Sequence, residues 1–132
     1  MAIASGDFHS VALKSDGTLV AWGMNTSGQT TIPANATGII AIASGGSHNL
    51  ALKNDGTVIA WGDNQAFQTN VPSSAIGVVS IDAGSSHSVA LKSDGSVIAW
   101  GFDKYFQNKI PLNLPAVSRI SASGNVSYFF FQ

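Results

Sequence analysis

The sequence predicts an all-β chain made of β-propeller blades, each with three to four antiparallel strands. Three observations carry this prediction: a 39-residue repeat, an Asp-Gly turn between two apolar runs in each repeat, and strands that are apolar on both faces. A period near forty residues with three or four strands per unit is typical of a propeller blade.

Four residue types recur at the same spacing of 39 residues. Because the spacing never slips, it predicts one propeller segment over 1–132, with repeat units over 3–41, 42–80 and 81–119 and a partial unit over 120–132. This corresponds to about three and a half blades per chain. The recurring residues are His9, His48 and His87; Trp22, Trp61 and Trp100; Gln29, Gln68 and Gln107; and Pro33, Pro72 and Pro111.

The middle unit shows the order of the predicted strands. A strand of small residues over 39–45 is followed by a short corner that carries the histidine, and then by a second strand over 50–53. Asn54-Asp55-Gly56 predicts a hairpin turn, because such turns need positive φ at their centre. A third strand over 57–62 ends at Trp-Gly, and a polar loop leads to the next unit.

The predicted strands do not alternate between apolar and polar residues. Val11, Ala12 and Leu13 are consecutive, as are the four residues of 19–22. A sheet that is wet on one side would alternate, so these strands indicate blades buried between two neighbours. We expect the small first strand at the crowded centre of the propeller and the tryptophan strand further out, where Trp fills the space between blades.

Composition and charge exclude several classes of protein. Hydrophobic residues make up 45% and charged residues 10%, which is typical of a folded chain rather than a disordered one. A net charge of -1 argues against nucleic-acid binding and against polybasic membrane attachment. Without cysteine there is no thiolate metal site. No phosphate-binding loop, carboxylate pair or zinc pattern is present, so we predict no enzyme activity, no cofactor and no metal site.

The motif Gly-x-x-His-Ser-x-Ala-Leu-Lys-x-Asp-Gly-x-x-x-Ala-Trp-Gly spans 6–23 and recurs over 45–62, with Asn49 in place of Ser, and over 84–101. At these residues the chain resembles the regulator of chromosome condensation repeat family. The segments Gln29-Thr30…Ile32-Pro33 and Gln68-Thr69…Val71-Pro72 are most similar to bacterial members such as β-lactamase inhibitor protein II. The resemblance implies a propeller and carries over no partner and no functional residue.

The three histidines occupy the same place in successive units. Neighbouring blades pack roughly 10 Å apart, which is too far for one shared metal site. We therefore expect each histidine to bond local backbone at a strand corner. Ser10 and Ser88 follow a histidine directly, and adjacent strand residues point to opposite faces, so neither is predicted to form a nucleophile–base pair with it.

Residues that differ between units are the candidates for function. The loops after Trp-Gly, over 24–28, 63–67 and 102–106, gain aromatic residues along the chain. Exposed rings beside Asp and Lys are typical of recognition patches, although rings here could equally fill the gap to the next blade or subunit. The partner-binding candidates are Phe67, Phe102, Asp103, Tyr105 and Phe106, with Phe8 on another loop.

The leading functional hypothesis is a non-catalytic protein-binding scaffold that uses loops on one propeller face. The alternatives are a structural repeat segment of a larger secreted or surface protein, and a carbohydrate-binding propeller. Propellers close with typically 4–8 blades, so three explanations stay open: an excised piece, two arcs that self-associate to complete a ring, or a larger assembly. The apolar run 128–131 favours self-association. Low charge and the bacterial resemblance favour a secreted or cell-surface location.

Overall fold

The computed structural model describes residues 1–102, 110 and 115–131, which form eleven strands in four antiparallel sheets. The first sheet contains β1 (Ala2–Ser5), β2 (His9–Leu13) and β3 (Leu19–Gly23). The second contains β4 (Ile39–Ser44), β5 (His48–Lys53) and β6 (Val58–Gly62). The third contains β7 (Val78–Ala83), β8 (His87–Lys92) and β9 (Val97–Gly101), and the fourth contains β10 (Val117–Ser123) and β11 (Val126–Phe131).

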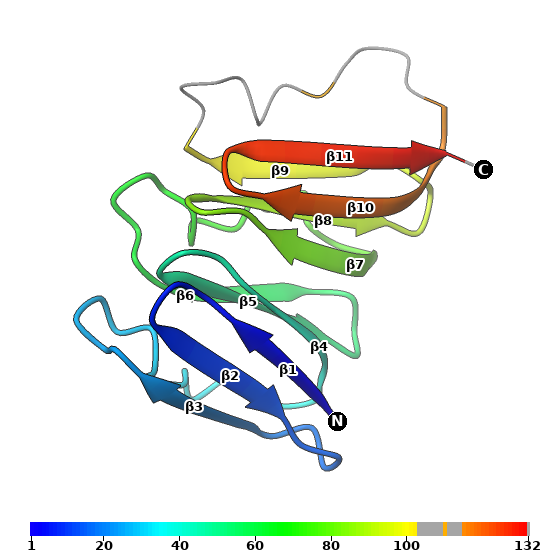
Figure 1. Cartoon of the computed structure of the whole chain (residues 1–132). Coiled ribbons are helices and arrows are strands. Elements are labelled where there is room, and N and C mark those ends of the chain that lie inside the picture. Colours follow the sequence, from blue (N-terminus) through cyan, green and yellow to red (C-terminus); the bar gives the residue numbers. More distant parts are fainter. Residues whose placement is uncertain (103–109, 111–114, 132) are drawn as a thin grey trace.

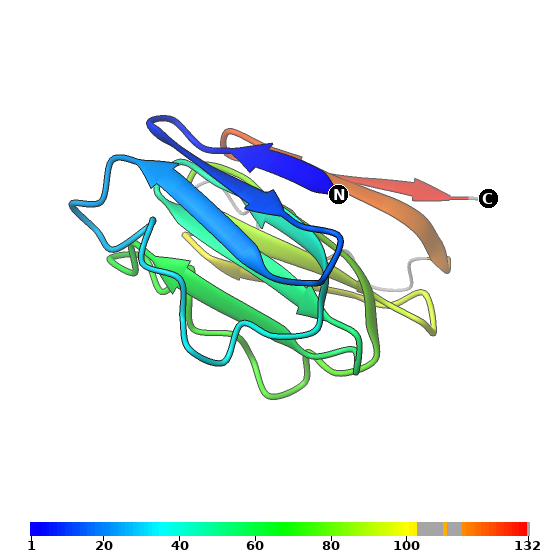
Figure 2. The same ribbon diagram turned by 90° about the horizontal axis from the view of Figure 1, so that it is seen from below.

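Each sheet is one blade, and the blades stack in chain order (Figure 1). Within a blade the strands pair as consecutive hairpins, with β5 between β4 and β6. Seen from below, the sheets lie one over the next in an arc (Figure 2). The first strands of neighbouring blades contact one another, so they form the inner side of the arc. The predicted all-β architecture of propeller blades is confirmed.

The Asp-Gly turns adopt the predicted backbone conformation. Gly17, Gly56 and Gly95 have φ values of 81°, 83° and 84°. The aspartate of each turn accepts hydrogen bonds from the hydroxyl and the amide of the residue that follows the glycine. Asp55 Oδ1 accepts from the Thr57 hydroxyl at 2.6 Å and from the Thr57 amide at 3.0 Å. These bonds lower the pKa of the turn aspartates Asp16, Asp55 and Asp94.

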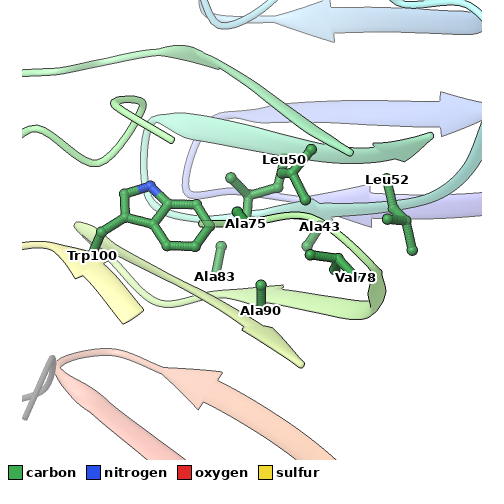
Figure 3. Packing of buried hydrophobic residues seen from close by; sticks show 9 residues of the cluster. Ala43, Leu50, Leu52, Ala75, Val78, Ala83, Ala90 and Trp100 are labelled. Carbon is green, nitrogen blue, oxygen red and sulfur yellow. The ribbon is translucent and has the colours of Figure 1, made fainter. Parts of the chain in front are cut away.

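The hydrophobic core lies between the blades. Leu50 and Leu52 of the second blade pack in one buried cluster with Ala83, Ala90 and Trp100 of the third (Figure 3). Trp61 packs in the same way with Val11 and Leu13 of the first blade. The predicted inter-blade role is therefore confirmed for Trp61 and Trp100, which are 7% and 6% exposed. Burial on both faces explains why these strands carry no apolar–polar alternation.

The first and fourth blades each expose one apolar face. Trp22 is 50% exposed, although it holds the same place in its blade as Trp61 and Trp100. In the fourth blade, Val126, Tyr128 and Phe130 are exposed where the second blade buries His48, Leu50 and Leu52. The burial of these positions thus depends on a neighbouring blade.

The two ends of the stack differ. The loop end carries the corners 6–8, 45–47 and 84–86, together with the starts of the loops that follow Gly23, Gly62 and Gly101; it lies to the left in Figure 1. Hydrogen bonds from Met24 to Phe8 and from Asp63 to Ser47 tie each loop to its corner. The hairpin end carries the Asp-Gly turns and the three lysines Lys14, Lys53 and Lys92.

Candidate functional site

The recurring histidines link neighbouring blades. His9 Nε2 lies 2.7 Å from Asn49 Oδ1, His48 Nε2 lies 3.0 Å from Ser88 Oγ, and His87 Nε2 lies 2.9 Å from Ser127 Oγ. The expectation of a bond to local backbone was wrong, because the ring reaches across to the second strand of the next blade. In each case the partner is the residue directly after the position that the histidine holds in the next unit. The 39-residue repeat alone therefore determines the partner, and no local motif marks it.

The pair His48–Ser88 has the residue types of a nucleophile and a base, but its geometry differs from that of a catalytic pair. The Ser88 hydroxyl donates to the Gln68 carbonyl oxygen at 3.0 Å, so the histidine nitrogen that faces it is the one carrying a proton. That nitrogen therefore cannot accept a proton from Ser88. Both side chains are fully buried, out of reach of a substrate.

Burial also sets the protonation of the histidines. Desolvation, followed by the charge of His87, lowers the pKa of His48 from 6.5 to about 4. Since Nε2 donates to Ser88, a second proton would have to sit on Nδ1, which is buried and has no hydrogen-bond partner among the described residues. Desolvation likewise lowers the pKa of His87. His48 and His87 therefore act in their neutral form.

The recurring tryptophans and glutamines form a second link between blades. The Gln29 carbonyl oxygen accepts hydrogen bonds from Trp61 Nε1 at 3.1 Å and from Asn49 Nδ2 at 2.8 Å. The Gln68 carbonyl accepts from Trp100 Nε1 at 2.9 Å in the same way. The first and second loops after Trp-Gly are thereby fixed to the following blade.

The corners form a third link, on the inner side of the loop end. The Asp7 amide donates to the Gly46 carbonyl at 3.0 Å, Gly46 donates to Ser85 at 3.0 Å, and Ser85 donates to Gly124 at 2.8 Å. Together with the ends of the first strands, these corners line a polar hollow of about 190 Å³. The amides of the three corners are already used within the chain, so the hollow is a structural feature of the arc.

The loop that begins at Asp63 is held by its own side chains. Asn64 accepts a hydrogen bond from the Thr69 amide at 2.9 Å and donates to Asn70 at 3.0 Å. Asp63 accepts from the Gln65 amide at 3.2 Å and from Gln68 Nε2 at 3.0 Å. The first loop uses Asn25 in the same manner. These polar residues therefore shape the loop.

Two of the predicted binding residues are widely exposed at the loop end. Phe8 is 67% exposed in the first corner and Phe67 is 66% exposed in the second loop. Phe102 begins the third loop, is partly buried, and donates its amide to the Ser86 carbonyl at 2.9 Å. The candidates Asp103, Tyr105 and Phe106 lie outside the described residues.

Two features of this face were not predicted from the sequence. Met24 is 43% exposed beside the Phe8 corner, to which its amide bonds, and it was not among the predicted binding residues. Phe67 has a φ of 62° and is the one non-glycine residue with positive φ in the described part of the chain. The sequence did hold a signal for this, because the equivalent residue of the first loop is Gly28, with a φ of 76°.

Within 1–102, 110 and 115–131, no three side chains of metal-binding type lie together. In the same part of the chain, no helix has the length and apolar character needed to cross a membrane.

Comparison with solved structures gives a consistent fold. Yeast RCC1 (Prp20), solved bound to Kap60, is 23% identical with a TM-score of 0.78; the match covers 93% of this chain and 39% of that chain. The ectodomain of the receptor kinase CR4 from Physcomitrella patens is 30% identical with a TM-score of 0.75, covering 93% and 33%. Prp20p from Saccharomyces cerevisiae, solved in a separate structure, is 24% identical with a TM-score of 0.70, covering 99% and 38%.

The chain therefore spans between a third and two fifths of the length of these similar structures. No curated protein matches it in sequence. The family model for the regulator of chromosome condensation (RCC1) repeat matches residues 2–29, 39–68 and 78–107, which together make up more than half of the chain. The chain thus belongs to the RCC1 repeat family.

Proposed function

We propose that the chain is a non-catalytic scaffold that binds a protein partner through the loop end of its blades. The single observation that carries this proposal is the exposure of Phe8 and Phe67 at the loop end, whereas Trp61 and Trp100 are buried between blades. Exposed aromatic side chains on a fixed support are typical anchors of protein interfaces. Within the family, we place the chain nearest the bacterial members, because its 39-residue units follow one another without insertions.

Similar structures support a role in protein binding. Prp20 has been solved in complex with Kap60, and the second Prp20p structure is described together with binding to Gsp1p and histones. Since this chain spans less than half of those proteins, their partners do not transfer to it. What transfers to the proposal is the use of such blades as a scaffold for protein interaction.

A carbohydrate-binding role is a weaker candidate. Sugar recognition needs free polar groups beside an aromatic ring to bond hydroxyl groups. Here Asp63 and Asn64 already bond groups of their own loop. The exposed aromatic residues also do not recur at one position of every blade. A glycan array that gave strong binding dependent on Phe67 would overturn this ranking.

The exposed faces of the first and fourth blades support self-association. Trp22, Tyr128 and Phe130 hold positions that are buried wherever a further blade covers them. We propose that a second copy of the chain supplies this cover and completes a ring, and that the protein is secreted or lies at the cell surface. Light scattering is expected to give a particle of at least twice the 13.6 kDa chain mass. A stable monomer in dilute solution would contradict self-association.

The loop-end proposal is testable with a random peptide library displayed on phage and selected against the purified chain. Enriched peptides are expected to bind the loop end, so Phe8→Ala and Phe102→Ala should each weaken them about tenfold. Tyr105→Ala and Phe106→Ala should have a similar effect if the third loop contributes. Ile40→Ala, an exposed apolar residue at the hairpin end, is the matched control and should leave binding unchanged.

Circular dichroism on each variant separates binding from folding. The proposal expects weaker binding with an unchanged unfolding midpoint for the loop-end variants. Equal losses of stability and binding would favour the packing interpretation of these rings. Enriched peptides that respond to Ile40→Ala alone, or no enrichment at all, would overturn the loop-end proposal.

A further inference from the structure

We infer that Phe67 is a preformed anchor, held in an unfavourable backbone conformation so that its ring projects into an apolar pocket with a basic rim on a partner protein. This inference rests on the proposed function and names the residue and the chemistry of the partner. It follows from the backbone at Phe67, from the bonds that fix its loop, and from the charges at the loop end.

The backbone at Phe67 disfavours a phenylalanine. Its φ of 62° lies in the left-handed region, where an L side chain is strained and glycine is not. The first loop has the same form with Gly28 at this place: the amide of residue 28 bonds the Asn25 carbonyl at 3.1 Å, and that of Phe67 bonds the Asn64 carbonyl at 3.1 Å. Glycine therefore adopts this loop conformation without strain, and phenylalanine adds backbone strain while the hydrogen bond stays the same.

Packing does not explain the phenylalanine either. The ring is 66% exposed, whereas the next residue, Gln68, is 1% exposed and bonds the third blade through Trp100. Gln68 bonds its own loop through its side chain and the third blade through its carbonyl, so it fixes the position of the exposed Phe67 before it. Strained residues that the surrounding structure holds in place are concentrated at binding sites.

Phe67 also lies beside the start of the third loop. A Cβ placed on Gly101 would lie 3.1 Å from the Gln68 Cα, so the segments 67–68 and 101–102 are in contact. This contact brings Phe67 and Phe102 to the junction of the second and third blades. At the corresponding junction of the first and second blades the residues are Gly28 and Asp63. The aromatic pair is therefore specific to one junction.

The charges at the loop end select the partner. Among the described residues, the loop end carries Asp7 and Asp63 and no lysine or arginine, while Lys14, Lys53 and Lys92 lie at the hairpin end. The sequence of the third loop adds one residue of each sign, Asp103 and Lys104, and so leaves the excess of negative charge unchanged. Arg119 lies in the first half of β10, over the Phe130 ring at 4.4 Å. A partner that receives the phenylalanine ring and is complementary in charge presents an apolar pocket bordered by lysine or arginine.

The decisive variant is Phe67→Gly, which gives the second loop the residue of the first. If Phe67 is an anchor, the variant should raise the thermal unfolding midpoint by about 2–4 °C, because it removes backbone strain. It should also weaken loop-end peptides from the phage library by tenfold or more. The reciprocal change, Gly28→Phe, should lower the midpoint by a similar amount. A lower midpoint for Phe67→Gly would show that the ring packs and would overturn the inference.

The selected peptides test the chemistry of the partner. They are expected to carry lysine or arginine near a cluster of apolar residues, and to bind less tightly in 0.5 M than in 0.05 M sodium chloride, since salt screens surface charges. Acidic or neutral peptides would contradict the charge argument. Peptides that lose affinity with Phe8→Ala or Phe102→Ala and keep it with Phe67→Gly would overturn this inference and leave the proposed function standing.

Discussion

Replacing Gly45 with alanine is expected to lower the free energy of unfolding by about 3 kcal/mol or more. A Cβ at this position would overlap the Gly84 carbonyl oxygen of the next blade and Cε1 of the His48 ring. Neither group can move freely, because the carbonyl belongs to the backbone and His48 is fully buried and bonded to Ser88. Urea unfolding followed by tryptophan fluorescence measures the change.

Two further glycines calibrate this result. Gly84→Ala repeats the overlap one blade later, with His87 and the Gly124 carbonyl, and should cost about as much. Gly28→Ala meets no atom within 4 Å and suffers only from its positive φ, so it should cost about 1 kcal/mol. If Gly45→Ala were no more destabilising than Gly28→Ala, the close contact between corner, histidine and next blade would be contradicted.

Lowering the pH from 7 to about 4 is expected to remove roughly 3 kcal/mol of stability through His48 alone. Burial lowers its pKa from 6.5 to about 4 in the folded chain, so the unfolded chain binds the proton more tightly. Stability is therefore full above pH 6.5 and falls as the pH drops towards 4. His87 and His9 disfavour the added charge and Asp63 favours it. The lowered pKa of His87 adds to the loss.

The turn aspartates do not interfere with this measurement. Hydrogen bonds lower the pKa of Asp16, Asp55 and Asp94 below 3.8, so their contribution to stability is lost only below that pH. Urea unfolding between pH 7 and 4 tests the expectation. His48→Gln should be less stable at pH 7 and show a shallower decline. A wild-type chain equally stable at pH 7 and 4.5 would contradict the neutral, buried histidine.

The fold was predictable from the 39-residue period, because each unit repeats its turn, its strands and its tryptophan. The inter-blade partners of the histidines were not predicted, since Asn49 and Ser88 lie forty residues further along the chain and become partners only when the blades stack. The alternation of strand residues correctly predicted that Ser88 does not pair with the adjacent His87. It carries no information about the histidine of the neighbouring blade, His48, with which Ser88 pairs.

The candidate site was partly predictable from the sequence. Loops that differ between units pointed to Phe67 and Phe8, which are exposed at one end. The strain at Phe67 could have been inferred by aligning it with Gly28, because glycine at a loop tip often marks a positive φ. The exposure of Trp22 does not follow from its local sequence, because the same Ala-Trp-Gly is buried in the next two units and only the stacking decides.

The central claim is that recurring histidines join neighbouring blades, with His48 as a neutral side chain. Nitrogen-15 NMR of the His48 ring during a pH titration tests it most directly. The account predicts a proton on Nε2, a neutral ring down to about pH 4, and a change of the Nε2 signal in the Ser88→Ala variant. A proton on Nδ1, titration near the ordinary pKa of 6.5, or an Nε2 signal indifferent to Ser88→Ala would contradict it.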